Sequence, residues 1–313
     1  MESRLEKKKM KKKRKWPFWV GGILIALIVL IGGYLFYLFD KVGDTVAVMH
    51  DPLSRDEDPD RQRELESIFS KTKSVNILLL GVDERKNDKG RSDTMILLSL
   101  NPKTDSLLML SIPRDTYVNI PGYGMDKINH AYAFGDVGLS IKTVEEAFDV
   151  PVHYYTKVNM EGFKQGIDAL DGVTVMNNQA FSQGGATFST GDIHLNGEAA
   201  LKYIRMRKDD PRGDLGRNER QRSVITAAMN EAASFSSITK IGDILEILGD
   251  NVKTNLNMDQ LQALFRDYRG TRKDMKTIEM NGTGKRLDKW YYMVSEEEFN
   301  RITTEIQSHT DAK

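Results

Sequence analysis

VNILLLGVD (75–83), TMILLSL (94–100) and SLLMLSI (106–112) are the runs that decide the fold of this chain. Each is short, continuously apolar and bounded by turn residues, which is typical of a strand buried on both faces. Further strands are predicted at 154–160, 172–176 and 201–207, and helices at 139–148, 161–170 and about 214–235. Alternating strands and helices predict an α/β/α domain, with a sheet covered by helices on both faces.

The segment after residue 235 extends the same domain. Its patterns predict helices near 240–249, 258–269 and 295–308, and a hairpin around Asn281-Gly282-Thr283-Gly284. No composition shift marks a second domain boundary. We therefore expect one domain over 74–313, with the candidate functional motifs in 74–235 and additional helices and a hairpin in 236–313.

The first 39 residues predict a membrane anchor. Residues 1–15 contain nine basic and two acidic side chains, and the 22 residues 18–39 contain no charged side chain. As a helix, 22 residues span roughly 33 Å, which matches a hydrocarbon core of about 30 Å. Lys and Arg favour the cytoplasmic side of a span. We therefore expect a cytoplasmic tail at 1–15, a single transmembrane signal anchor at 16–39 and an extracytoplasmic domain.

Two other interpretations of this segment are weaker. A cleaved signal peptide needs a small-x-small site, whereas residues 34–39 are bulky. The basic run also fits a nucleic-acid patch, but the orientation of the span explains it fully. We expect a lipid bilayer and no nucleic acid among the partners. Residues 40–73, which are rich in charge and contain Pro52 and Pro59, predict a stalk between membrane and domain.

Composition excludes several chemistries. The chain has no cysteine, so disulfides, iron–sulfur clusters and thiol nucleophiles are ruled out. An exported domain without cysteine fits a Gram-positive cell. GxSxG, HExxH and Walker motifs are absent, and the five histidines are scattered without ligand spacing. The 45 basic and 45 acidic residues give a net charge of zero, but residues 201–222 alone carry net +4. This concentration indicates a local anion site.

Arginines dominate that basic stretch. In a strand over 201–207, Arg205 and Arg207 would point to the same face. Arg217 and Gln221 share a helix face by i,i+4 spacing. Arginine is costly to bury without an anionic partner, which favours an anionic ligand.

Charged residues also cluster at the ends of the first strands. Asp83 ends the first strand, Arg91 and Asp93 precede the second, and Arg114 follows the third. Strand ends form the ligand crevice of open α/β sheets, so Asp83 and Arg114 are expected to converge. Arginines with two carboxylates suit a metal-assisted diphosphate site. Plain salt bridges remain the alternative for each residue singly, and Asp115 in particular fits an ion-pair partner.

Several ordered motifs carry a resemblance to a known family. They are LGVD at 80–83, RSDT at 91–94, SIPRD at 111–115, KINHAY at 127–132, YIRMR at 203–207 and GRNERQ at 216–221. Together they closely resemble the LytR–CpsA–Psr family, over the anchor, the stalk and the domain up to about residue 235. The resemblance implies a central mixed sheet and a polyprenyl tail buried between sheet and helices, although core packing remains the default role of each apolar residue.

The resemblance also implies an activity. Family members are membrane-anchored phosphotransferases that move an anionic glycopolymer, commonly wall teichoic acid, from undecaprenyl diphosphate to the muramic acid C6 hydroxyl of peptidoglycan, forming a phosphodiester. It implies Mg²⁺, with Mn²⁺ as a substitute, held by Asp83 and Asp93. The implied diphosphate ligands are Arg91, Arg114, Arg205, Arg207, Arg217 and Gln221. Asp83, Arg114 and Arg207 are the implied catalytic residues, with Asp83 the expected base.

Two other functions remain open from the sequence. The same site suits a pyrophosphatase that uses water as the acceptor. A non-catalytic polyprenyl-phosphate carrier or regulator is the other, although the expected cytoplasmic tail of about 15 residues holds no DNA-reading element.

Overall fold

The computed structural model of the chain describes residues 43–84, 90–207, 210–232, 249 and 251–312. The predicted tail (1–15) and membrane anchor (16–39) lie outside these residues, as does the helix predicted near 240–249 apart from residue 249. Among the described helices, none combines the length and the apolar character needed to cross a membrane.

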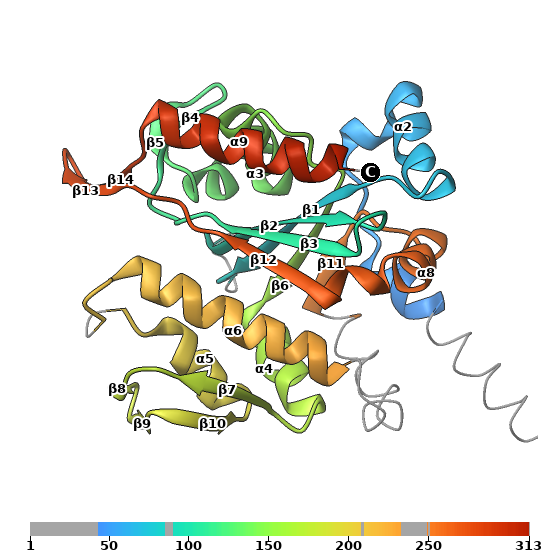
Figure 1. The fold of residues 1–313 in the computed structure, drawn as a ribbon. Coiled ribbons are helices and arrows are strands. Elements are labelled where there is room, and N and C mark those ends of the chain that lie inside the picture. Colours follow the sequence, from blue (N-terminus) through green and yellow to red (C-terminus); the bar gives the residue numbers. More distant parts are fainter. Residues whose placement is uncertain (1–42, 85–89, 208–209, 233–248, 250, 313) are drawn as a thin grey trace, which may run out of the picture. The chain divides into compact units, whose positions relative to one another are not determined.

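A six-stranded mixed sheet forms the centre of the domain (Figure 1). β1, β2 and β3 pair antiparallel in chain order, β6 and β12 add in parallel at either side, and β11 closes one edge antiparallel. The apolar runs 75–83, 94–100 and 106–112 form β1, β2 and β3. The predicted mixed sheet is confirmed. The strands are β1 Val75–Val82, β2 Ser92–Asn101, β3 Ser106–Ser111, β6 Tyr154–Asn159, β11 Val252–Thr254 and β12 Asp274–Ile278.

Two helices cover one face of the sheet. α3 (His130–Phe148) and α9 (Glu296–Asp311) lie above it in Figure 1. Ile141, Val144 and Phe148 of α3 and Ile302 and Ile306 of α9 join the largest cluster of buried apolar side chains. β1 to β3 contribute to this cluster with every second residue, because alternate side chains of a strand point to opposite faces.

The other face packs against different helices. Ile225 and Met229 of α6 (Asp214–Ala232) contact the cluster of β2 and β3 side chains around Ile96 and Met109. α2 (Pro59–Ser70) and α8 (Met258–Asp267) flank a second cluster around Tyr154. Burial on both faces explains why the central strands read as continuous apolar runs, and it confirms the predicted α/β architecture.

A smaller layer lies beyond α6, at the bottom of Figure 1. It contains α4 (Met160–Ala169), α5 (Gly197–Arg205), the pair β7 (Val173–Asn177) and β10 (Gly191–Leu195), and the pair β8 (Phe181–Gln183) and β9 (Ala186–Phe188). Phe181, Phe188 and Tyr203 form its aromatic centre. The strand predicted at 172–176 is present as β7, but it pairs with β10 outside the central sheet.

The strand predicted at 201–207 is wrong. Residues 197–205 form helix α5, whose N-terminus is capped by the Asn196 side chain accepting from the Ala199 N–H. The alternation of apolar and polar residues made 201–207 resemble a strand. In the structure Leu201, Tyr203 and Ile204 lie with Ala200 on the buried face of the helix. Arg205 and Arg207 therefore do not share a strand face. Arg205 ends the helix, and Arg207 follows it in an extended segment that begins at Met206.

The stalk predicted at 40–73 is also corrected, because the chain packs onto the domain from residue 44. Residues 43–49 are helical, and α2 buries Leu65 and Ile68. Arg55 of the short 3₁₀ helix η1 (Ser54–Glu57) donates to the Val152 carbonyl at 2.6 Å and pairs with Glu145 at 2.7 Å. Arg55 thus attaches this segment to the domain.

Two hairpins belong to the upper layer, each with one strand that is partly buried. The first pairs β4 (Tyr117–Ile120) with β5 (Gly124–Lys127), and the second pairs β13 (Thr283–Arg286) with β14 (Trp290–Met293). The second hairpin turns at 287–289, not at the predicted 281–284. Gly284 instead lies opposite Tyr292, where a Cβ would come within 2.7 Å of the Trp290 indole. Glycine at this position therefore leaves free the space beside its Cα that the Trp290 ring occupies.

The buried His153 makes the stability of this fold depend on pH. Its Nδ1 accepts from the Asn76 N–H at 2.9 Å, and burial, together with the charge of Arg61, lowers its pKa to about 4. Between pH 6.5 and 4 the unfolded chain binds a proton at this residue and the native chain does not. We expect the free energy of unfolding to fall by about 2 kcal/mol between pH 7 and 5 on this account, measured by urea unfolding. His153→Asn, which keeps an acceptor, should remove that share of the pH dependence, whereas His194→Asn, at an exposed histidine, should not.

Candidate active site

A pocket of about 300 Å³ opens where the carboxyl end of β3 meets the start of β2, the segment after α5 and hairpin β13–β14. Four of the predicted site residues, Arg91, Asp93, Arg114 and Arg207, line it. The other lining residues are Asp115, Lys127, Asn129, His130 and Trp290. Of the two residues expected to converge at the strand ends, Arg114 lines this pocket and Asp83 does not.

A β-bulge aims Asp93 into this pocket. Gly81 pairs with Thr94 and Val82 pairs with Ser92, so Asp93 is the extra residue on β2. A bulge bends the strand and redirects the side chain of the inserted residue. Asp93 consequently accepts from Nη1 of Arg114 at 2.7 Å, across from the end of β3.

Asp115 is the anion around which the cationic side chains gather. It is buried, and its carboxylate accepts from Lys127 Nζ at 2.7 Å. Arg114 Nε and Arg207 Nη1 lie 3.8 and 3.9 Å from the same carboxylate. The alternative considered for Asp115, that of an ion-pair partner, is the one the structure supports. The pocket is lined by four cationic side chains, Arg91, Arg114, Lys127 and Arg207, and two carboxylates, Asp93 and Asp115, which leaves positive charge for an anion entering it.

A buried ion pair fixes the loop that carries Arg207. Arg220 of α6 donates to Asp210 Oδ2 at 2.6 Å and to the Met206 carbonyl at 2.6 Å. Asp210 is fully buried; burial alone would raise its pKa, but the hydrogen bond from Arg220 outweighs burial and lowers it. A Cβ at Gly216 would come within 1.8 Å of Asp210 Oδ2, so the first turn of α6 packs directly on this carboxylate.

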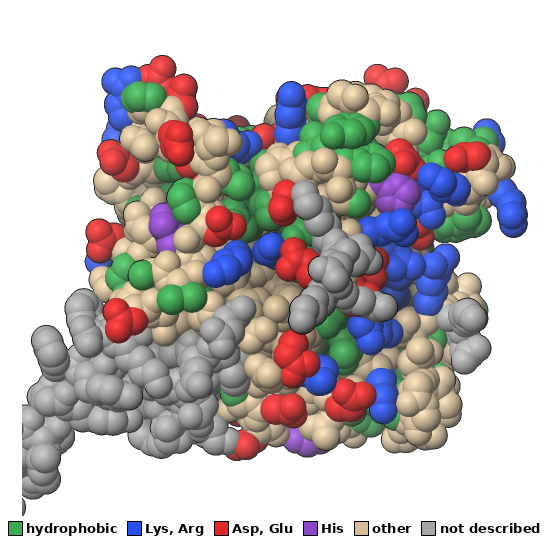
Figure 2. Space-filling view, turned by 180° about the vertical axis from the view of Figure 1, so that it is seen from behind, with side chains coloured by type: hydrophobic (Ala, Val, Ile, Leu, Met, Phe, Trp, Pro, Cys, Tyr) green, Lys and Arg blue, Asp and Glu red, His purple; other side chains and the backbone are tan. Residues whose placement is uncertain are grey.

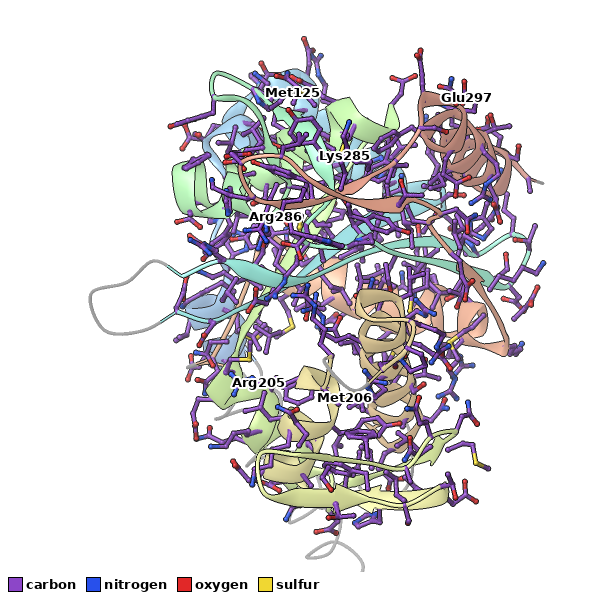
Figure 3. The ribbon with its side chains drawn as sticks, turned by 90° about the vertical axis from the view of Figure 1, so that its left-hand side faces the viewer. Met125, Arg205, Met206, Lys285, Arg286 and Glu297 are labelled. Carbon is purple, nitrogen blue, oxygen red and sulfur yellow. The ribbon has the colours of Figure 1, made fainter. Side chains whose placement is uncertain are left out.

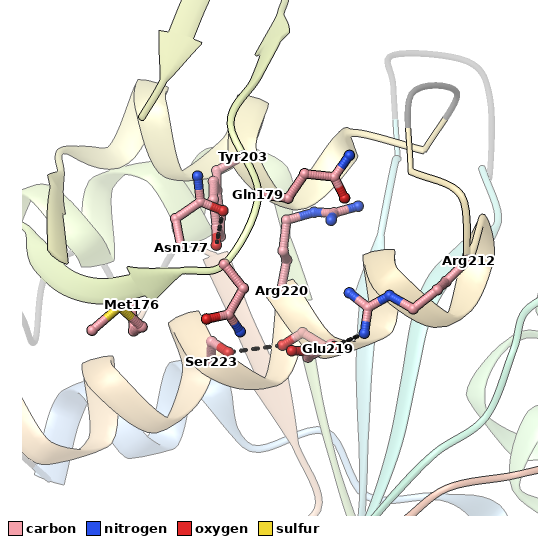
Figure 4. A pocket seen from close by; sticks show the side chains of 9 residues that line it. Met176, Asn177, Gln179, Tyr203, Arg212, Glu219, Arg220 and Ser223 are labelled. Carbon is pink, nitrogen blue, oxygen red and sulfur yellow. Dashed lines mark hydrogen bonds and ion pairs between the residues drawn. The ribbon is translucent and has the colours of Figure 1, made fainter. Parts of the chain in front are cut away.

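The cavity beside Arg220 is too small for a substrate. Figure 4 shows it, lined by Asn177, Tyr203, Arg212 and Glu219 among others. Its volume is about 20 Å³, which suits roughly one water molecule. Arg212 pairs with Glu219 at its rim. We therefore assign Arg220 to holding the loop and the 300 Å³ pocket to the ligand.

Four lining residues were given no role by the sequence analysis. Lys127, Asn129 and His130 belong to a motif quoted only for its resemblance, and Trp290 had no signal at all. His130 Nδ1 lies 2.7 Å from Asp126 Oδ2. Burial alone would raise the pKa of Asp126, but the hydrogen bonds from His130 and from the backbone N–H of Lys127 outweigh burial and lower it. Arg207 lies over the Trp290 ring, 5.6 Å from its centroid.

The remaining predicted residues do not line the pocket. Asp83 follows β1 and its N–H donates to the Arg91 carbonyl at 3.3 Å, next to the bulge. Arg217 and Gln221 are buried on α6, and Arg205 is exposed at the end of α5. Figure 3 looks onto this end of the domain, with Arg205 and Met206 below the sheet and Lys285 and Arg286 of β13 above it.

The surface around the strand ends is rich in basic side chains. Figure 2 shows Lys and Arg side chains at mid-height on one face, most of them towards the right, with acidic side chains among them. The pocket itself contributes Arg91, Arg114, Arg207 and Lys127. Arginine binds phosphate oxygens in a bidentate manner, so the arrangement suits a ligand with several phosphate oxygens.

The carboxylates of this region fit a magnesium ion in their donor chemistry. Asp83 and Asp93 stand at the adjoining ends of β1 and β2, and both offer the oxygen ligands that Mg²⁺ prefers. No group of three acidic, histidine or cysteine side chains suited to a metal occurs in the described part of the chain. Mg²⁺ is commonly held by one or two carboxylates, with substrate phosphates and water completing its shell, so two suffice.

The chain belongs to the LytR–CpsA–Psr family. The model of the LytR_cpsA_psr family matches residues 36–308, which confirms the family predicted from the motifs. Over 99% of both chains, the protein is 61% identical to the polyisoprenyl-teichoic acid–peptidoglycan teichoic acid transferase TagU of Oceanobacillus iheyensis.

Solved structures show the same fold. The crystal structure of Bacillus subtilis TagU superposes with a TM-score of 0.62 at 44% identity, covering 77% of this chain and 98% of that one. TagT bound to LI-WTA superposes with a TM-score of 0.66 at 33% identity, covering 77% and 92%.

The buried pair under the Arg207 loop gives a stability prediction. Asp210→Ala leaves the Arg220 guanidinium buried without its carboxylate, and we expect the free energy of unfolding to fall by about 3–5 kcal/mol. Glu146→Ala removes a partner from an exposed ion pair on α3 and should change stability by less than about 0.5 kcal/mol. Urea unfolding of both variants checks this. Equal values for the two would show that the buried pair contributes nothing special.

Proposed function

We propose that this chain transfers an anionic glycopolymer of the teichoic acid class from a polyisoprenyl-diphosphate carrier to peptidoglycan. The convergence of Arg91, Arg114, Arg207 and Lys127 on one pocket carries this proposal, because such a site suits a diphosphate. The identity to TagU over the full chain supports the same polymer and acceptor. We infer undecaprenyl diphosphate as the carrier and the muramic acid C6 hydroxyl as the acceptor.

The reaction is a phosphoryl transfer. The acceptor hydroxyl oxygen bonds to the phosphorus next to the glycopolymer, the bond from that phosphorus to the bridging oxygen breaks, and polyprenyl phosphate leaves. The hydroxyl proton passes to a base; Asp83, which follows β1 outside the pocket lining and next to the pocket residue Arg91, stays the predicted one. Catalysis of this kind depends on positioning and on neutralising the phosphate charge. Arg114 and Arg207, whose guanidinium groups lie 3.8 and 3.9 Å from the Asp115 carboxylate, line the pocket where that charge would be neutralised.

Each remaining predicted residue receives a role within this proposal. Asp83 and Asp93 would hold Mg²⁺, or Mn²⁺ in its place, and the ion would supply further charge neutralisation when bound. Arg205, Arg217 and Gln221 would contact the diphosphate only if the carrier extends beyond the pocket towards α5 and α6. An N-terminal anchor at 16–39 would hold the domain outside the cell, beside its lipid-linked donor.

Arg114 gives the first test of this function. Arg114→Ala should lower transfer by about a hundredfold or more, because a preorganised charge is worth a few kcal/mol at the transition state. Transfer is measured with a lipid-diphosphate glycan and peptidoglycan oligomers. Arg266→Ala, at an exposed arginine on α8 outside the pocket, is the matched control and should transfer at the wild-type rate. A wild-type rate for Arg114→Ala would remove Arg114 from the mechanism.

The products of the same assay separate the alternative functions. A glycan–peptidoglycan adduct indicates transfer. Free glycan phosphate indicates a pyrophosphatase, and unchanged donor that nevertheless binds the chain indicates a carrier.

The metal ligands have a readout that does not depend on activity. Mn²⁺ binding, followed by its electron paramagnetic resonance signal in the presence of inorganic pyrophosphate, should weaken about tenfold or more in Asp93→Asn. Asp105→Asn, at an exposed carboxylate far along the sheet from the pocket, should bind as the wild type does. Wild-type Mn²⁺ affinity in Asp93→Asn would exclude Asp93 as a ligand.

A further inference from the structure

A row of aromatic rings runs from the edge of the pocket to the protein surface. His130 lines the pocket, and its ring meets Phe134 edge-on with centroids 5.9 Å apart. Phe134 stacks on Tyr123 with centroids 4.7 Å apart and planes 15° apart. Tyr123 is 59% exposed and Phe134 is 40% exposed. We name these three residues the aromatic strip.

A tight turn presents Tyr123. Pro121 and Gly122 occupy the centre of the turn between β4 and β5, which the Tyr123 N–H closes by donating to the Ile120 carbonyl at 2.9 Å. Gly122 has φ +83°, as position i+2 of a type II turn requires. The Tyr123 hydroxyl also donates to the Phe134 carbonyl at 3.3 Å. The two rings are therefore fixed to each other before any ligand arrives.

A strained kink exposes Phe134. α3 is interrupted immediately after it, at Gly135 and at Asp136 with φ +60° and ψ −154°. This backbone region is almost restricted to glycine and costs a residue such as Asp on the order of 1–3 kcal/mol. The Asp136 side chain compensates in part by accepting from the Val137 N–H at 2.8 Å. Strain of this kind gathers at ligand sites, and here it occurs beside the exposed stack.

The uncharged, exposed rings of the aromatic strip suit a sugar as the ligand. A pyranose presents C–H groups on its flat faces, and these stack on the negative face of an aromatic ring. Neither Tyr123 nor Phe134 carries a charge, so a polyphosphate chain gains little from them. Its phosphates instead match the exposed basic residues of hairpin β13–β14, Lys285 and Arg286, which Figure 3 shows below Met125 of β5.

We propose that the aromatic strip binds the glycan strand of peptidoglycan and leads its acceptor hydroxyl into the pocket. The inference rests on the proposed function, since a transferase must seat an acceptor on a surface continuous with its donor pocket. His130 provides that continuity, because it lines the pocket and contacts Phe134. Donor and acceptor would thus approach over two neighbouring surfaces, the donor over the basic residues of hairpin β13–β14 and the acceptor over the aromatic strip.

The first experiment measures transfer by the full chain in detergent, with peptidoglycan oligosaccharides as the acceptor. Tyr123→Ala and Phe134→Ala should each raise the KM for the acceptor about tenfold, which is the loss of one ordinary stacking contact, and leave the KM for the donor unchanged. Tyr123→Phe keeps the ring and should retain a KM near that of the wild type. Phe265→Ala removes a 79% exposed ring on α8, away from the strip, and should change neither constant.

A second experiment needs no transfer, so the aromatic strip can fail separately from the proposed function. Binding of peptidoglycan oligosaccharides to the chain is followed by NMR or calorimetry without donor. Tyr123→Ala should weaken this binding about tenfold, even if the wild type shows no transfer at all. Unchanged glycan affinity in Tyr123→Ala and Phe134→Ala would overturn the inference. So would loss of binding to anionic lipid vesicles in place of loss of glycan binding, which would make the strip a membrane contact.

Discussion

The cost of burying charge governs the architecture of the pocket. A guanidinium group is stable inside a protein only where a carboxylate meets it with good geometry. Asp93 meets this requirement for Arg114 at 2.7 Å, and Asp210 meets it for Arg220 at 2.6 Å. Asp115 pairs with Lys127 at 2.7 Å and lies 3.8 and 3.9 Å from Arg114 and Arg207. The site is thus an array of cations held by fewer anions, so it is ordered before a ligand binds and still attracts one.

Each charged group is placed by a different part of the chain. The bulge on β2 aims Asp93, the end of β3 supplies Arg114 and Asp115, and the segment after α5 brings Arg207. The backbone carbonyl of Asp115 also accepts from the Tyr292 N–H at 2.8 Å, which ties β14 to the same point. A rigid sheet with converging loops is a common way to combine a stable scaffold with adaptable chemistry.

A feature of this protein could be predicted from the sequence where the residues that determine it lie within the same short segment. The central strands were evident, because burial on both faces makes a strand continuously apolar. Residues 201–207 were misassigned, since the Asn196 cap that decides for a helix lies outside that run. Arg114 was expected from its place at the end of the third strand, and Asp93 from the family resemblance; the structure brings both to the pocket. Trp290 and Lys127 could not be found, because only the folding back of two hairpins brings them to the pocket.

The order of the strands has a consequence for biosynthesis. β12 pairs with β3, and α9 covers one face of β1 to β3. Both begin more than 150 residues after the end of β3. At about 5–20 residues per second, those strands wait on the order of ten to thirty seconds for the segments that cover them. Until then α3 is the helix available to cover that face, and β3 lacks its neighbour β12 at the sheet edge.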